Sequence, residues 1–110
     1  MILPAIKRGS AELAVLVILS EGRLHGYEIA KQIEVRTGGV LRFTLASLYP
    51  LLYNLEKRGF VRGAWETTKS GRRRRCYVLT SPGKKQLVPL REEWVQFFRA
   101  LNQIAGIINA

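Results

Sequence analysis

Hydrophobic residues in the first half of the chain recur every three or four positions, which predicts three helices. We place them over residues 10–21, 25–37 and 44–58, after a lead-in of residues 1–9. Ser10 and Thr44 are the expected N-caps of the first and third helices, because their hydroxyl groups can accept a hydrogen bond from the first turn. The side chains expected inside are those of Leu13, Leu16, Val17, Leu19, Tyr27, Ile29, Ala30, Ile33, Leu45, Leu48, Leu52 and Leu55. Pro50 falls within the third helix and predicts a bend or a late start there.

After residue 59 the pattern changes to one that is typical of strands. Residues 60–66 and 74–80 are rich in β-branched and aromatic residues, and the polar, glycine-containing stretch between them predicts a turn. The result is a β-hairpin with a basic tip. Ser81 and Pro82 then predict the start of a last helix, with the serine as its cap and the proline in its first position.

The last helix carries an apolar stripe at heptad spacing. Its members are Leu87, Leu90, Trp94, Phe97, Leu101, Ile104 and Ile108. Three short helices and a hairpin leave little surface to cover this stripe, so we expect two copies of the helix to pair, aided by Leu16 of the first helix. Packing of the stripe within one chain is the alternative. Pro89 predicts a kink or a restart near the beginning of the helix.

The order of these elements is that of a winged helix-turn-helix domain. The expected fold class is therefore mostly α with a small β-hairpin (α+β). We assign residues 1–80 to the winged helix-turn-helix domain and residues 81–110 to a C-terminal dimerisation helix.

The charge of the chain is strongly positive. It has 18 Lys and Arg residues against 8 acidic residues, all of them Glu, and a net charge of +10. Twelve of the basic residues and four of the acidic ones lie between residues 23 and 75. Binding to a polyanion is the common reason for such a balance, with nucleic acid ahead of a membrane surface. A highly charged protein without such a partner is the alternative.

Enzymatic and metal chemistry have few residues to use. With one His, one Cys and no Asp, the chain can build neither a His-based triad nor a conventional metal site, and we expect no enzyme activity, metal or cofactor. We expect His25 to cap or pack at the start of the second helix. A single cysteine, with no recognisable signal peptide or membrane-spanning stretch, indicates a cytoplasmic protein. Cys76, beside Arg75, is either a reactive thiol or, more usually, a small buried strand residue.

Several short motifs follow one another along the chain. They are HGYEI at residues 25–29, SLYPLL at 47–52 with LE at 55–56 and GFV at 59–61, Y-x-L-T at 77–80 followed by Gly83, and the acidic–Trp pair at 93–94. In this order and spacing they resemble the PadR family of winged helix-turn-helix transcriptional regulators, over about residues 10–100. Ala46, where the family usually has Gly, and Cys76, where an aromatic residue is common, depart from the pattern.

The resemblance implies a cytoplasmic, dimeric repressor that binds a palindromic operator near a promoter. It also implies a response to a small aromatic or drug-like ligand near the dimer interface. Trp94, with Phe97, is the candidate effector site, because a flat aromatic ring can stack on a planar ligand. Packing of Trp94 against its mate in the dimer is the alternative.

The exposed start of the third helix is the expected reader of DNA, because the major groove admits a helix. The candidate contacts in the helices are Tyr27, Thr44, Ser47, Tyr49 and Asn54. Asn54, together with Lys57 and Arg58, lies further along the third helix and is a weaker candidate. For Ser47 a local capping role is the alternative, and for Tyr49 a place in the core.

The hairpin supplies positive charge at its tip. The basic residues there are Lys69, Arg72, Arg73, Arg74 and Arg75. Alternation along a strand sends Arg73 and Arg75 to one side and Arg72 and Arg74 to the other. We favour Lys69, Arg72 and Arg73 for contact with the minor groove or flanking phosphates, and keep Arg74 as a further candidate. A merely solvated cluster of charges is the alternative.

These patterns together predict a sequence-specific DNA-binding regulator that represses transcription as a homodimer. Two recognition helices roughly 34 Å apart would read an inverted repeat. The expected partners are double-stranded DNA, a second copy of the chain and a small aromatic or drug-like effector, with no membrane partner. The rival class is a non-specific nucleic-acid-binding module, such as a nucleoid-associated protein. The winged-helix order and the apolar stripe of the last helix argue against an RNA-binding platform, which would more often show aromatic residues on an exposed sheet.

Overall fold

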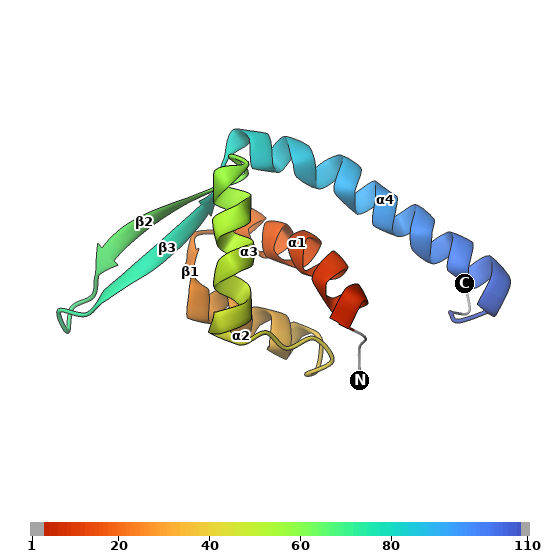
Figure 1. The fold of residues 1–110 in the computed structure, drawn as a ribbon, viewed down its shortest axis with the longest axis horizontal. Coiled ribbons are helices and arrows are strands. Elements are labelled where there is room, and N and C mark those ends of the chain that lie inside the picture. Colours follow the sequence, from red (N-terminus) through yellow and green to blue (C-terminus); the bar gives the residue numbers. More distant parts are fainter. Residues whose placement is uncertain (1–3, 109–110) are drawn as a thin grey trace.

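The computed structural model describes the backbone of residues 4–108 and the side chains of residues 9–108. This part of the chain contains, in order, α1 (Pro4–Ser20), β1 (Leu24–His25), α2 (Gly26–Arg36), α3 (Leu45–Lys57), β2 (Val61–Thr67), β3 (Arg73–Leu79) and α4 (Ser81–Ala105). Helices α1, α2 and α3 form a central body, from which the β2–β3 hairpin and α4 extend in opposite directions (Figure 1).

The first helix is longer than its sequence predicts. α1 begins at Pro4, so the predicted lead-in is wrong from residue 4 onward, and Ser10 lies inside the helix instead of capping it. Residues 1–3 of the lead-in lie outside the described residues. The helix tolerates Gly9 because the indole of Trp94 packs against it: a Cβ at Gly9 would lie 3.6 Å from two carbons of the ring. The contact with α4, which no local pattern reveals, supports the additional turns.

The second and third helices follow the predicted boundaries. His25 is the N-cap residue of α2, and its backbone N–H donates a hydrogen bond to the Glu28 carboxylate at 3.3 Å. Thr44 caps α3 as predicted, because its hydroxyl accepts a hydrogen bond from the Ser47 N–H at 3.1 Å. Pro50 lies inside α3 without ending it.

The fourth helix begins one residue earlier than a cap at Ser81 would require. Its N-cap is Thr80, whose hydroxyl accepts a hydrogen bond from the Gly83 N–H at 3.1 Å, so Ser81 is the first helical residue and the predicted cap is wrong. The backbone N–H of Thr80 also donates to the Phe60 carbonyl at 3.1 Å. This tertiary hydrogen bond holds Thr80 extended at the corner, which leaves it and not Ser81 in the capping position.

The far end of α4 also differs from the prediction. The helix continues through Pro89 without a restart and ends at Ala105. Gly106 follows with a φ of 60°, a left-handed conformation that glycine adopts without strain and that commonly terminates helices. Ile108 therefore lies beyond the helix and cannot continue its apolar stripe.

The two long strands pair along their full length as the predicted hairpin. Val61 lies opposite Leu79, and Thr67 lies opposite Arg73. A short strand, β1, adds to the other edge of β3, which gives an antiparallel sheet in the order β1–β3–β2. β1 is absent from the prediction, because two residues are too few to show an alternating pattern.

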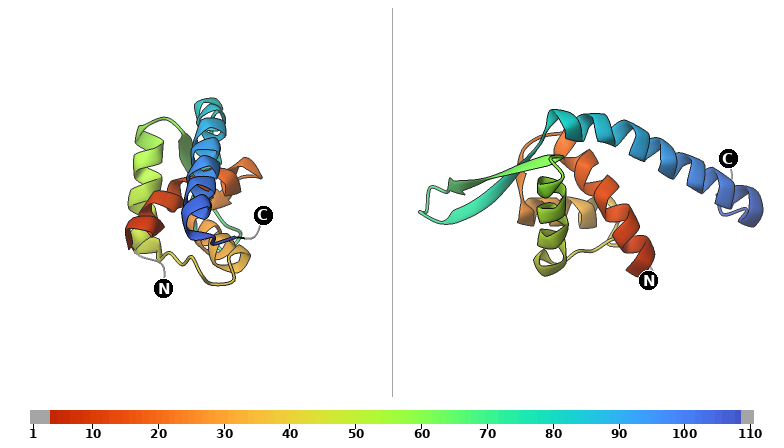
Figure 2. Two further views of the ribbon diagram at one scale, coloured as in Figure 1. Left: turned by 90° about the vertical axis from the view of Figure 1, so that its right-hand side faces the viewer. Right: turned by 45° about the horizontal axis from the view of Figure 1, so that its top comes forward.

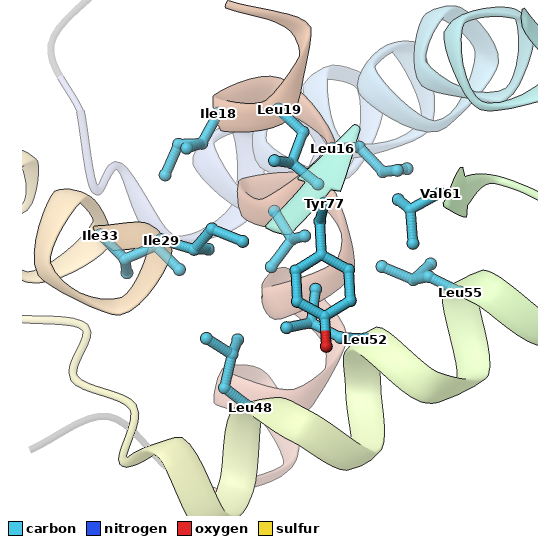
Figure 3. Packing of buried hydrophobic residues seen from close by; sticks show 11 residues of the cluster. Leu16, Ile18, Leu19, Ile29, Ile33, Leu48, Leu52, Leu55, Val61 and Tyr77 are labelled. Carbon is cyan, nitrogen blue, oxygen red and sulfur yellow. The ribbon is translucent and has the colours of Figure 1, made fainter. Parts of the chain in front are cut away.

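The hydrophobic core lies between α1, α2, α3 and the base of the sheet (Figure 3). Its buried members are Val15, Leu16, Ile18, Leu19, Ile29, Ile33, Leu48, Leu52, Leu55, Val61 and Tyr77. Leu16 is completely buried in this core, so its predicted place in a dimer interface is wrong: no surface of it remains for a second chain. Tyr27 and Leu45, which were expected inside, are exposed, because the first turns of α2 and α3 open onto a groove instead of the core.

The arrangement is that of a winged helix-turn-helix, as predicted, with α2 and α3 as the helix pair and β2–β3 as the wing. The right-hand view in Figure 2 shows α4 as a separate arm that extends beyond α1. Between residues 4 and 108, none of the helices combines the length and apolarity that crossing a bilayer requires.

Candidate nucleic-acid interface

A groove of about 760 Å³ separates the first turns of α2 and α3 from the wing. It is lined by His25, Gly26, Tyr27, Leu45, Tyr49, Trp65, Thr68, Ser70, Arg72, Arg73, Arg74, Arg75 and Tyr77. Aromatic rings and guanidinium groups make up most of this lining. Such a lining suits an extended polyanion that carries flat, stackable groups.

Two predicted contact residues at the start of α3 form a local hydrogen-bond pair. The Ser47 hydroxyl donates to the Thr44 carbonyl at 3.0 Å, and the two hydroxyl groups lie 3.2 Å apart. The local role considered for Ser47 is therefore real. Both residues are nevertheless exposed at the open end of the helix, where hydroxyl groups remain accessible to a ligand.

Tyr49 lines the groove and does not belong to the core. Its ring lies across the backbone of Gly26, where a Cβ would come within 2.9 Å of Cε1. Glycine at this position allows α2 and α3 to approach closely and leaves 44% of Tyr49 exposed. Tyr27 lies nearby, 59% exposed, with its ring stacked on that of His25 at a centroid distance of 6.4 Å.

The exposed side of α3 presents more residues than the sequence singled out. Asn54 is exposed, as expected, but it does not line the groove. Tyr53 and Lys57 follow Tyr49 at four-residue intervals, so the three residues share one face of the helix. Tyr53 is 68% exposed and was missed. Its position four residues from Tyr49 is the signal that could have identified it.

Strand alternation gives the wing two chemically different faces. Trp65 lies opposite Arg75 in the register, and Glu66 lies opposite Arg74. Because successive side chains point to opposite sides of a sheet, Trp65, Arg73 and Arg75 share the inner face toward the groove. The predicted separation of Arg73 and Arg75 from Arg74 is thus confirmed.

The inner face is a stacked arrangement of one indole and two guanidinium groups. The Arg73 and Arg75 Cζ atoms lie 5.2 and 5.7 Å from the centroid of the Trp65 ring. Arg75 also reaches Glu56 of α3, at 3.0 Å from Oε1 and 2.8 Å from Oε2. The hydrogen bonds that Arg75 donates to Glu56 raise the pKa of Arg75. Trp65 is a residue of the site that the sequence analysis missed.

The outer face contains a compact polar cluster around Glu66. Its carboxylate pairs with Arg23, lies 3.7 Å from Arg74 and accepts a hydrogen bond from the Cys76 thiol at 3.2 Å. The hydrogen bond from Cys76 is the main cause that lowers the pKa of Glu66, and Arg23 and Arg74 lower it further. Burial raises the pKa of the Cys76 thiol. Arg74 therefore offers a ligand less free charge than Arg73 does.

The tip of the wing is an ordered loop. The Thr68 N–H donates to the Arg72 carbonyl at 2.8 Å, and the Arg72 N–H donates to the Thr68 hydroxyl at 3.1 Å. Among the side chains that the structure describes, no carboxylate lies within ion-pair distance of Lys69, Arg72 or Arg73. These three cations, favoured from the sequence, are uncompensated charges at and near the tip of the wing.

The arm α4 exposes its apolar stripe. Leu87 and Leu90 pack partly against the core, whereas Phe97, Leu101 and Ile104 are exposed. Trp94 contacts the ring of Phe97 edge-on at a centroid distance of 5.6 Å. A hollow of about 350 Å³ adjoins this pair and is also lined by Gly9, Leu90 and Glu93. In residues 4–108 no group of three or more His, Cys, Asp or Glu side chains could hold a metal ion.

The fold and the groove together define a winged-helix protein with a basic wing. A family model, described as the transcriptional regulator PadR-like family, matches residues 15–88, and the chain belongs to this family. An uncharacterized protein of Lysinibacillus sphaericus is 31% identical over 96 residues, which cover 87% of this chain and 88% of that protein.

Solved structures of transcriptional regulators share the fold. One from Clostridium thermocellum is 28% identical, with a TM-score of 0.86, and the match covers 96% of this chain and 99% of that one. Bacillus subtilis PadR, solved in complex with operator DNA, is 26% identical, with a TM-score of 0.64. That match covers 76% of this chain and 45% of the PadR chain. The family and these neighbours are regulators and not enzymes.

Proposed function

We propose that the chain is a sequence-specific DNA-binding repressor that acts as a homodimer on an inverted-repeat operator in the cytoplasm. The observation that carries this proposal is the groove between the start of α3 and the wing, with uncompensated cations at one side and exposed tyrosines at the other. The operator complex of the related Bacillus subtilis PadR supports it.

The two sides of the groove have different tasks in this proposal. α3 enters the major groove, where Ser47, Tyr49 and Asn54 contact base edges or phosphates and Thr44 contacts the backbone. Tyr27 at the start of α2 meets the same DNA strand. The wing follows the flanking backbone with Lys69, Arg72 and Arg73, and Arg74 assists at lower strength because Glu66 shares its charge.

The arm supports the dimeric state. Its exposed apolar stripe includes Phe97, Leu101 and Ile104. Leaving these side chains in contact with water is unfavourable in free energy. Pairing of two arms covers the stripe and sets two copies of α3 side by side, which is the geometry an inverted repeat requires.

An effector site fits the hollow beside Trp94. A small planar aromatic compound of the size of this hollow would stack on Trp94 and Phe97 and release the protein from DNA. Because Trp65 also emits, the test uses a Trp65→Phe protein, in which Trp94 is the sole tryptophan. Quenching of Trp94 by planar aromatic compounds supports the site, and unchanged emission with all of them overturns it.

The central experiment is selection of bound sequences from a random DNA pool, followed by a mobility-shift assay on the selected duplex. We expect an inverted repeat, and a shift that survives an excess of unrelated duplex. Loss of the shift under competition supports the rival, a non-specific nucleic-acid-binding module. Arg72→Ala is expected to weaken binding to all duplexes about equally. It should also reduce the slope of the logarithm of affinity against the logarithm of salt concentration by about one for each wing.

A further inference from the structure

We propose that Trp65 and Arg75 are positioning residues, which hold the guanidinium of Arg73 in place for DNA, and that Glu56 anchors them to α3. This inference rests on the DNA-binding function proposed above and deepens it. It assigns a role to the exposed tryptophan of the wing, which the proposed contacts do not use.

The register of the hairpin brings the stack together. Arg75 lies directly across from Trp65, and Arg73 lies two residues along on the same face. Both guanidinium groups are within 6 Å of the ring centroid, the range in which a cation is attracted to an aromatic face. Trp65 is 58% exposed, so burial in a core does not explain its position.

Glu56 of α3 anchors the stack of Trp65, Arg73 and Arg75 to that helix. Glu56 receives two hydrogen bonds from Arg75 and a third from the backbone N–H of Gly63 at 3.1 Å. A Cβ at Gly63 would lie 2.6 Å from Nε of Arg75, so the missing side chain gives the guanidinium its path to Glu56. The wing and α3 are thus connected by an ion pair in which one guanidinium nitrogen of Arg75, Nη2, lies within hydrogen-bond distance of both carboxylate oxygens of Glu56.

The distribution of charge separates the two arginines. Glu56 compensates Arg75, whereas no described carboxylate lies within ion-pair distance of Arg73. Arg73 therefore keeps its charge for a phosphate, and stacking on Trp65 reduces the number of conformations that it must lose on binding. A long, freely rotating arginine at the same place would bind the same phosphate more weakly.

The first test does not involve DNA. In a Trp94→Phe protein Trp65 is the sole tryptophan, and quenching of its emission by acrylamide measures how well the stack shields the ring. Arg73→Ala and Glu56→Gln are each expected to increase quenching. Arg74→Ala, next in sequence but on the outer face, is expected to leave it unchanged. Equal quenching in all four proteins overturns the stack.

The second test is a double-mutant cycle on the selected duplex. Trp65→Leu is expected to weaken binding about five- to 30-fold in a dimer with two wings, and Trp65→Phe is expected to restore most of the affinity. In an Arg73→Ala background, Trp65→Leu should change the affinity by less than about twofold. In an Arg74→Ala background its full effect should remain.

The outcomes separate this inference from the proposed function. If Trp65→Leu weakens binding equally with and without Arg73, Trp65 contacts DNA itself and the positioning role is overturned while DNA binding stands. If the quenching results agree but no selected duplex binds the unmodified protein, the proposed function fails, and the role of the stack in DNA binding fails with it.

Discussion

Gly83 of α4 lies directly against the carbonyl oxygen of Phe60, at the corner where α3 leads into the wing. A Cβ at Gly83 would overlap this oxygen and would come within 2.7 Å of Cδ1 of Leu79. The carbonyl cannot move aside easily, because it accepts a hydrogen bond from the Thr80 N–H. The arm therefore meets the wing and the recognition helix at a corner that only glycine fits.

Gly83→Ala is expected to destabilise the protein by about 1–3 kcal/mol, the usual cost of forcing an extra methyl group into a packed site. Urea unfolding followed by circular dichroism measures the change. Gly9→Ala is the matched control, because its methyl group would lie in ordinary contact with Trp94 at 3.6 Å. Since alanine favours a helix interior, Gly9→Ala should stabilise by roughly 0.5–1 kcal/mol. Equal effects of the two substitutions would contradict the packing at the corner.

Thr80→Ala is expected to lower the free energy of unfolding by about 1–2 kcal/mol, because it removes the cap of α4. The hydroxyl also donates to the Gly59 carbonyl at 2.6 Å. Ser81→Ala, one residue further along, should change the free energy of unfolding by less than about 0.5 kcal/mol. The same unfolding assay applies. A larger loss at Ser81 than at Thr80 would show that the serine is the true cap.

Cys76 is expected to react slowly with a bulky thiol reagent at pH 7 in the folded protein and rapidly after unfolding in guanidinium chloride. The thiol is buried, and burial raises its pKa, so little reactive thiolate is present. The pKa of the thiol is higher in the folded state than in the unfolded state. Near neutral pH the thiol is protonated in both states, so its ionisation does not affect stability. Stability should fall as the pH rises above about 8.5, the ordinary thiol pKa. Labelling at equal rates in both states would instead support a reactive sensor.

Leu101→Glu is expected to convert the proposed dimer to monomers, because it places a charge within the apolar stripe of the arm. Val88→Glu is the control on the same helix: Val88 is 71% exposed and lies outside the heptad positions. Sedimentation velocity at micromolar concentration distinguishes the two states. Dimers that persist in Leu101→Glu would exclude this face of the arm as the interface.

The affinity for the selected operator should depend steeply on salt, because the wing binds phosphates by charge. If a dimer neutralises roughly 6–10 phosphates, binding should weaken about 10³- to 10⁵-fold between 50 and 200 mM salt. Fluorescence anisotropy of a labelled duplex measures this dependence. A binding constant that stays level over this range would contradict the electrostatic role of Lys69, Arg72 and Arg73.

Local patterns predicted the elements that depend on neighbours in sequence. The periodicity of Leu48, Leu52 and Leu55 predicted α3, and two-residue alternation placed Arg73 and Arg75 on one face of the wing. The same patterns could not tell which of two adjacent hydroxyl residues, Thr80 or Ser81, caps α4. That choice depends on a hydrogen bond to Phe60, about 20 residues away in the chain.

The sequence analysis missed or misplaced residues whose contacts are with segments far away in the sequence. Leu16 is apolar, as residues of a dimer interface often are, but α2, α3 and the sheet enclose it. From the sequence Trp65 is an ordinary strand residue, and only the tertiary structure brings two guanidinium groups over its ring. In both cases the surroundings come from segments far away in sequence, and periodicity contains no information about them.

The sequence by itself determined the order of the helices and the hairpin, the concentration of positive charge on the wing and the apolar stripe of the last helix, because each follows from composition and short-range spacing. Only the tertiary structure decided which side of each element is covered. It buried Leu16, exposed Tyr49 across Gly26 and tied Arg75 to Glu56 while leaving Arg73 uncompensated. These outcomes depend on how close two segments approach in space, and at Gly26, Gly63 and Gly83 that approach is set by the absence of a side chain.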